Sequence, residues 1–144
     1  MKGAARMLLG KRVVLCVESG IEAMRLRYDL LQAGLYVIGS AAKGRDAVDV
    51  VLESNPDIVL MDVDLQEMNG LEAAQRLLAH GRFCIVMIAE DSQEMMEQKA
   101  RQIGVSDYLV QPVTRETLLS RLEAAWETFE RKNQSEVTNT EKVA

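Results

Sequence analysis

Short apolar runs alternate with segments of helical period along most of this chain. Five runs rich in β-branched residues are too short for helices and are bounded by Gly, Pro, Asp or Ser. These runs are the segments 13–17, 36–41, 58–62, 84–89 and 108–110. The pattern predicts a parallel sheet covered on both faces, and we expect all five strands to face the interior.

Helices are predicted between the strands and after the last one. Their segments are 21–32, 45–54, 71–79, 93–103 and 115–132. Asn69-Gly70 precedes the third and Asp91-Ser92 the fourth, and either pair could cap the first turn of its helix. The last helix carries one apolar stripe that could cover the sheet or a partner, formed by Leu118, Leu122, Ala125, Trp126 and Phe129.

The fivefold alternation predicts an α/β fold with a single doubly wound five-stranded parallel sheet flanked by helices. Residues 12–132 are expected to form this domain, after an N-terminal extension at 1–11. Residues 133–144 are polar and non-periodic, and we expect a flexible tail there. A chain of 144 residues with 48% hydrophobic content can build one core without a disulfide or a structural metal.

Charge and cysteine usage narrow the partners and the compartment. The 17 basic and 22 acidic residues give a net charge of −5, which argues against nucleic-acid binding and favours protein or small-ion partners. Cys16 and Cys84 lie in apolar runs without metal or redox spacing, as expected of buried thiols in a reducing cytoplasm. The apolar part of the N-terminus, Met7 to Leu9, is too short for a signal peptide or a membrane span.

Acidic residues follow three of the predicted strands. They are Glu18 after the first strand, Asp62 and Asp64 at the end of the third, and Glu90 after the fourth. Ligands of open parallel sheets collect at the carboxyl ends of the strands, so convergence of Glu18 and Asp62 would favour a hard ion such as Mg²⁺. Asp62 could then attack a phosphoryl group. The alternative is that these acids cap helices and face water.

Several motifs in the expected order resemble the receiver domains of bacterial response regulators. The run 56–62, Pro-Asp-Ile-Val-Leu-Met-Asp, followed by Met-Asn-Gly-Leu-Glu at 68–72, resembles the phosphoacceptor region of that family. The segment 13–17 with Glu18, and the segment 107–110 before Pro112, are similar to its first and fifth strands. The resemblance covers roughly residues 12–129 and implies a CheY-like, flavodoxin-like fold.

The resemblance also implies roles for individual residues in a two-component phosphorelay. Asp62 would accept phosphate from a sensor histidine kinase or another signalling protein, and Mg²⁺ would be held by Glu18, Asp62 and the backbone carbonyl of Asp64. Tyr108 would be the switch aromatic, which turns inward when phosphate is bound. No residue is assigned a catalytic role, and an enzyme is not expected.

Four positions depart from the pattern of that family. Ser19 replaces the second acid after the first strand, Ile88 replaces the Thr or Ser that ends the fourth, and Gln111 replaces the Lys that ends the fifth. Gln66 stands in place of the proline in the loop after the acceptor. A neutral amide cannot neutralise a phosphoryl group as an ammonium does. We therefore expect an atypical receiver with weak or no phosphorylation-dependent switching, or a constitutive interaction module.

Two further resemblances give alternatives. Asp62-Val63-Asp64 resembles the Asp-x-Asp signature of haloacid-dehalogenase-type phosphatases, although the downstream lysine and acidic pair of that family cannot be placed. The short link before the fourth strand and the 126–131 end are similar to receivers of AmiR/NasR-type antiterminators, whose last helix continues into a coiled coil and an RNA-binding domain. This sequence carries neither extension, so output would come from a partner, from a homodimer through the Trp126 side of the last helix, or from a part of the protein outside this sequence.

Overall fold

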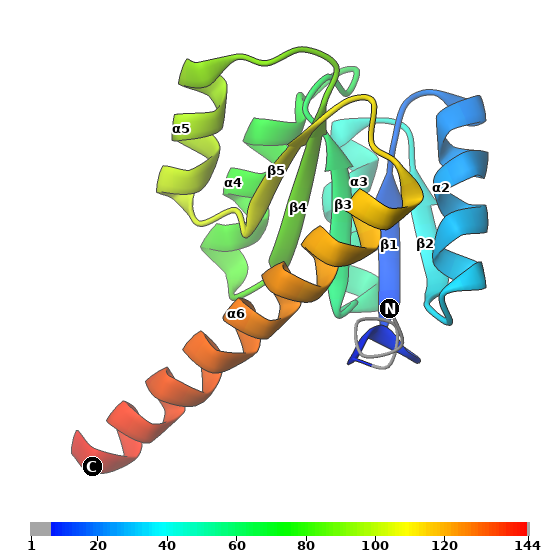
Figure 1. Cartoon of the computed structure of the whole chain (residues 1–144). Helices are drawn as coiled ribbons and strands as arrows, with labels where there is room; N and C mark the ends of the chain where they lie inside the picture. Colours follow the sequence, from blue (N-terminus) through cyan, green and yellow to red (C-terminus); the bar gives the residue numbers. More distant parts are fainter. Residues whose placement is uncertain (1–6, 144) are drawn as a thin grey trace.

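The computed structural model describes residues 7–143, with side chains described as far as Ser135. Strands and helices alternate along the whole described chain, as Figure 1 shows. In chain order they are β1 (Arg12–Cys16), α2 (Gly20–Gln32), β2 (Tyr36–Ala41), α3 (Gly44–Ser54), β3 (Ile58–Asp62), α4 (Gly70–His80), β4 (Cys84–Ala89), α5 (Glu94–Ile103), β5 (Asp107–Val110) and α6 (Arg115–Val143).

The five strands form one sheet in the order β2-β1-β3-β4-β5, and every neighbouring pair is parallel. This topology confirms the predicted fold class. The strand order reverses between β1 and β3, and in such sheets the crevice for a ligand lies outside the carboxyl ends of the strands at this reversal. Glu18 and Asp62 lie on these two neighbouring strand ends, so the topology brings them together.

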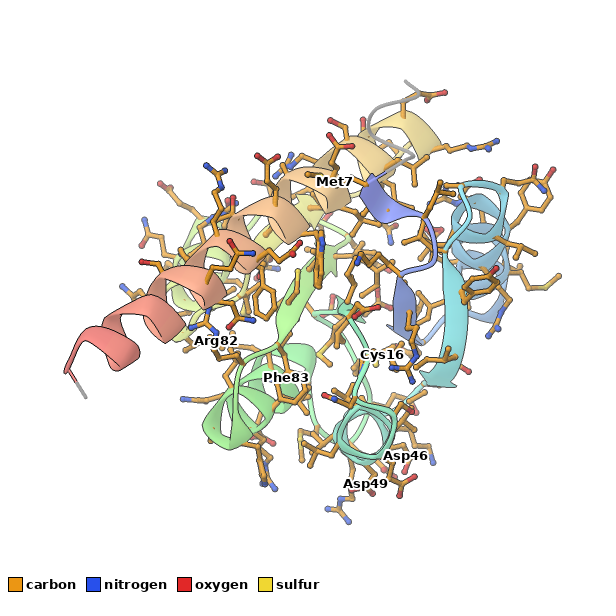
Figure 2. The ribbon with its side chains drawn as sticks, turned by 90° about the horizontal axis from the view of Figure 1, so that it is seen from below. Met7, Cys16, Asp46, Asp49, Arg82 and Phe83 are labelled. Atoms are coloured by element: carbon orange, nitrogen blue, oxygen red, sulfur yellow. The ribbon has the colours of Figure 1, made fainter. Side chains whose placement is uncertain are left out.

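Helices cover both faces of the sheet and give two apolar cores. On one face α2 and α6 pack against the sheet, and their buried side chains include Leu26, Leu30, Leu118 and Leu122. On the other face lie α3, α4 and α5, with Val51, Leu77 and Ala100 buried. Cys16 and Cys84 are buried free thiols, as predicted, and Figure 2 shows Cys16 in the interior. Within residues 7–143 no helix is both long enough and apolar enough to cross a membrane.

Helix starts agree with the sequence to within one residue, but only one of the two proposed caps forms. Asn69 caps α4, because its side-chain oxygen accepts a hydrogen bond from the backbone N–H of Glu72 at 2.9 Å. Neither Asp91 nor Ser92 caps α5, which begins after Gln93 without a side-chain cap bond. Asp91 and Ser92 have the right propensity but lie two positions and one position before the N-cap residue Gln93, too early to cap the free N–H groups of that helix.

The expectation that all five strands face the interior is wrong for β2. This strand is at the edge of the sheet, and its side chains alternate between exposed and partly buried, with Tyr36 57% and Ile38 37% exposed. Its register with β1 shifts between Val13 and Val14, so that these residues pair with Val37 and Gly39. A register shift of this kind on an edge strand disrupts the row of free backbone groups that another chain could pair with.

Residues 133–143, where we expect a flexible tail, continue the last helix, because α6 extends to Val143. Ala144 lies outside the described residues. Figure 1 shows α6 crossing the sheet and extending past the body of the domain. Its first half is fixed by packing of the predicted stripe, in which Trp126 is 8% exposed, so the stripe covers the sheet. Once a helix is nucleated, each added residue gains a backbone hydrogen bond at low cost, and polar residues can extend it.

The described part of the expected N-terminal extension packs onto the domain. Leu8 is fully buried in the core that α2 and α6 share. The backbone N–H of Gly10 donates to the carbonyl oxygen of Gly34 at 2.8 Å, which ties this segment to the turn before β2. Residues 1–6 lie outside the described residues. The core of the domain therefore begins before residue 12, where the sequence pattern placed its start.

Candidate functional site

A cavity of about 580 Å³ lies at the carboxyl ends of the strands. Five acidic side chains line it, together with one amide, one hydroxyl and two apolar residues. The acids are Glu18, Glu22, Asp62, Asp64 and Glu90, and the others are Ser19, Ile21, Ile88 and Gln111. The lining contains no Lys or Arg among the described residues. The structure thus brings together three predicted ligand residues and three predicted substituted positions.

Asp62 ends β3 and lies partly buried at the base of this cavity. Its Oδ2 accepts a hydrogen bond from the backbone N–H of Glu18 at 3.1 Å. Burial raises the pKa of Asp62 to about 6, the Glu18 N–H partly offsets this, and the charges of Glu22, Asp64 and Glu18 raise it further. A carboxylate with so little positive charge around it favours a bound cation or proton.

Glu18 follows β1, and its side chain is anchored from another loop. Its Oε1 accepts a hydrogen bond from Nε2 of Gln66 at 2.8 Å. The other predicted ligand, Asp64, is exposed on the loop after β3. Its side chain lines the same cavity, so the short spacing between Asp62 and Asp64 places both at one opening.

The donor set at this cavity fits a divalent cation that keeps part of its water shell. Within the described residues, no three His, Cys, Asp or Glu side chains are grouped closely enough to hold a metal alone. Mg²⁺ in proteins is usually held by one or two carboxylates and keeps several waters. Glu18 and Asp62 can supply the carboxylates, and a backbone carbonyl can supply a further oxygen. The excess of negative charge in the cavity favours the same ion.

Three of the substituted positions line the cavity, and each contributes a side chain that would stabilise a bound anion poorly. Oγ of Ser19 accepts from the backbone N–H of Glu22 at 3.3 Å and thereby caps α2. Ile88 is 2% exposed near the end of β4 and presents only an apolar side chain. Gln111 precedes a cis bond to Pro112 and places a neutral amide at the cavity. As far as the chain is described, the cavity wall therefore offers no cation to an anion at Asp62.

Tyr108, the predicted switch aromatic, lies inside the domain on β5. It is 3% exposed and packs in the core that α3, α4 and α5 cover. Its hydroxyl is buried and has no hydrogen-bond partner among the described residues. Burial raises the pKa of this phenol, and the charges of Glu97 and Asp64 add to the effect. The ring thus packs inside the domain.

Sequence reasoning missed two contributors to the cavity and the role of a third residue. Ile21 and Glu22 line it from the first turn of α2, and their position directly after the first strand end was the available signal. Gln66 was noted only as a missing proline, and nothing in the sequence indicates its bond to Glu18. The phosphatase alternative needs a lysine near Asp62 and Asp64, and the described lining contains none.

The sequence of this chain is similar to those of known signalling proteins. Residues 14–123 match the family described as the response regulator receiver domain. The chemotaxis protein CheY of Thermotoga maritima is 33% identical over 105 residues, which are 72% of this chain and 88% of that protein. The transcriptional regulatory protein PdtaR of Mycobacterium tuberculosis is 29% identical over 119 residues, 83% of this chain and 58% of PdtaR. The chain thus spans somewhat more than half the length of PdtaR.

A solved structure with the same fold agrees with these matches. The CheX–CheY–BeF3–Mg²⁺ complex from Borrelia burgdorferi matches with a TM-score of 0.81 and 21% identity. The match covers 85% of this chain and 98% of that one. Strand order and helix placement are therefore shared over nearly the whole length of the solved chain.

Proposed function

The chain belongs to the response regulator receiver domain family of two-component signalling, and from that premise we propose that Asp62 is its phosphoacceptor and that phosphorylation is weak and poorly coupled to switching. One observation carries the second half of this proposal. The cavity around Asp62 is lined by five carboxylates and, among the described residues, by no Lys or Arg. A dianionic phosphoryl group would meet repulsion there without a counter-charge from the protein.

The residue near the end of β4 supports weak coupling. Ile88 stands where a hydroxyl would follow the phosphate and cannot bond to it. A receiver that lacks this hydroxyl would present the same surface whether or not Asp62 carries phosphate, and a constitutive interaction module is therefore the alternative form of the proposal.

Mg²⁺ is the cofactor that this proposal requires, as is typical of receiver domains. Glu18, Asp62 and the backbone carbonyl of Asp64 would hold it. The ion would neutralise charge on the transferring phosphoryl oxygens. Asp62 would supply the attacking oxygen, and the Glu18 N–H would orient its carboxylate by the bond at 3.1 Å. With Ser19 in place of a second acid, we expect binding to be weak.

The partner would be a sensor histidine kinase or another signalling protein, and the outer face of α2 supports this. Four large apolar side chains on that face are exposed, and steps of three, four and three residues separate them. They are Ile21, Met24, Tyr28 and Leu31, which are 84%, 72%, 60% and 58% exposed. Such a patch indicates an interaction surface, and Ile21 also lines the acidic cavity. A protein docked on α2 would therefore reach Asp62.

The last helix is the proposed site of self-association. Its Trp126 side packs on the sheet, so a homodimer through α6 would use the part of this helix that extends past the body of the domain in Figure 1. Buried free thiols at Cys16 and Cys84 suit the reducing cytoplasm. Receiver domains are in general signalling domains rather than enzymes, and we assign this chain no activity beyond accepting phosphate. Nucleic-acid and membrane partners are not part of the proposal.

Incubation with acetyl phosphate and Mg²⁺, followed by intact-mass measurement, tests the proposed function. We expect substoichiometric modification that is absent from Asp62→Asn, and little change in the near-ultraviolet spectrum when BeF3 is added. Stoichiometric, Asp62-dependent modification with a large spectral change would contradict weak coupling. Complete absence of modification would favour the constitutive interaction module over a phosphoacceptor.

A further inference from the structure

Gln66 lies at the centre of the loop that follows β3, and its backbone is held from two sides. Its carbonyl oxygen accepts from the N–H of Gly44 at 3.1 Å and from the N–H of Met68 at 2.7 Å. An isolated parallel bridge also pairs it with Lys43, directly before α3. The loop after the acceptor is thereby joined to the loop between β2 and α3.

Close packing at this junction leaves the loop little freedom. A Cβ atom on Gly44 would overlap the carbonyl oxygen of Met68, so only glycine permits the observed approach. Met68 itself is 6% exposed and belongs to one of the two cores. The backbone from which the Gln66 side chain projects is therefore fixed by neighbours on both sides.

The amide of Gln66 reaches from this fixed loop to a third loop. Its Nε2 donates to Oε1 of Glu18 at 2.8 Å, a contact between residues 48 positions apart in the chain. Glu18 shares its cavity with Asp62, Glu22 and Asp64, whose charges repel its carboxylate. Without an anchor, a side chain in this position would turn outward to water. The amide is neutral and engages one carboxylate oxygen, so Oε2 of Glu18 keeps its charge and lone pairs for a cation.

We propose that Gln66 is a positioning residue for the divalent cation, because it holds the Glu18 carboxylate toward Asp62 before the ion arrives. This inference rests on the proposed Mg²⁺ site. Groups that hydrogen-bond to metal-binding carboxylates fix their orientation, and their loss typically weakens metal binding by about 10- to 100-fold. Gln66 has this relationship to Glu18, and it stands where the family pattern has a proline without a donor.

If Gln66 instead hindered the ion, its substitution would change the metal affinity in the opposite direction. If the amide competed with the ion for Glu18, its removal would free a ligand and strengthen metal binding. The substitution Gln66→Met tests this, because methionine has similar length and no donor. Gln66→Ala serves as a second variant. Gln75→Met is the matched control, since Gln75 is exposed on α4 and outside the cavity.

The experiment measures binding of Mn²⁺, as a paramagnetic substitute for Mg²⁺, to each full-length chain by electron paramagnetic resonance. We expect both Gln66 variants to bind Mn²⁺ about tenfold or more weakly, Gln75→Met to match the original chain, and the unfolding temperatures in EDTA to remain equal. Equal or tighter binding by the Gln66 variants, or no Mn²⁺ binding by the original chain, would overturn the inference. Mn²⁺ binding without phosphoryl transfer would overturn the proposed function alone.

Discussion

Arg121 of α6 binds Asp107 of β5 through two nitrogens of its guanidinium group. Nε lies 2.6 Å from Oδ2, and Nη2 lies 2.7 Å from Oδ1. Asp107 is 9% exposed, and its Oδ1 also accepts from Nη2 of Arg101 at 3.2 Å and from the N–H of Tyr108 at 2.8 Å. Burial alone would raise the pKa of Asp107, but these donors, led by Arg121, hold it below its usual value. The buried carboxylate thus connects α5, β5 and α6.

Arg121→Ala should lower the free energy of unfolding by about 1.5–3 kcal/mol, the range for hydrogen bonds to a charged group. The reason is that the Asp107 carboxylate would stay largely buried and lose its two shortest hydrogen bonds. Urea denaturation at neutral pH measures the change. Arg131→Ala on the same helix is the control, because its pair with Glu127 is exposed and should contribute less than about 1 kcal/mol. Equal effects of the two substitutions would contradict this assignment.

The fold was largely predictable from local pattern, but contacts between distant loops were not. The run that ends at Asp62 and the cap at Asn69 are encoded within a few residues, and each element starts within one residue of its prediction. The bonds from Gln66 to Glu18 and from Arg121 to Asp107 join separate elements. They depend on how loops and helices meet, which apolar periodicity does not specify.

The structure differs from the sequence prediction in β2 and in the segment 133–143, and the two differences have physical causes of the same kind. The sequence of β2 is apolar, but its place at the sheet edge follows from strand order, which the run itself does not contain. The polar segment 133–143 has no apolar stripe, yet a helix already nucleated by packing at Leu118 and Leu122 can continue through it. In both segments, the neighbouring elements determined the structure, and the local composition did not.

Asp62→Asn should stabilise the fold at pH 7.5 in EDTA by about 1–2 kcal/mol, which is less than the roughly 3 kcal/mol of the full pKa shift because the group is partly hydrated. The folded-state pKa is raised to about 6 from 3.8, so the folded chain binds the proton more tightly. The original chain therefore loses stability as pH rises from 3.8 to about 6, and the gain from Asn should vanish below that window. Asparagine keeps an oxygen for the Glu18 N–H.

Urea denaturation at pH 3.5 and at pH 7.5 measures this difference. The control is Asp49→Asn, since Asp49 is exposed on α3 and lies on the outer side of that helix in Figure 2. A gain that is the same at both pH values would mean that burial of the ionised Asp62 carboxylate, with the repulsion it meets from nearby acids, is not the cause of the gain.

Tyr108→Phe should raise the free energy of unfolding by about 1 kcal/mol, because the buried hydroxyl has no partner among the described residues and its desolvation is uncompensated. Thermal unfolding of the two chains measures the change. Tyr28→Phe is the matched control, since Tyr28 is 60% exposed and its hydroxyl stays in water in both states. A loss of stability in Tyr108→Phe would show that the hydroxyl bonds to a group such as bound water.

Gln111→Lys should strengthen the response of the site to phosphate analogues, because it places a cation in a cavity whose described lining has none. A charge-assisted hydrogen bond contributes about 1.5–3 kcal/mol, which corresponds to roughly a 10- to 150-fold gain in affinity for BeF3 in the presence of Mg²⁺. Fluorine nuclear magnetic resonance of the bound BeF3 measures that affinity. The added ammonium should also lower the pKa of Asp62 from about 6.

The control for this substitution is Gln102→Lys, which adds the same charge at an exposed position on α5 outside the cavity. If Gln102→Lys gave an equal gain, the effect would come from net charge rather than from a local contact. If Gln111→Lys gave no gain in affinity for BeF3, the absence of a lysine at this position would not be what limits phosphoryl binding. The apolar Ile88 and the capping hydroxyl of Ser19 would then be the remaining causes of a weak site, because each removes a group that could bond to the phosphoryl oxygens or the ion.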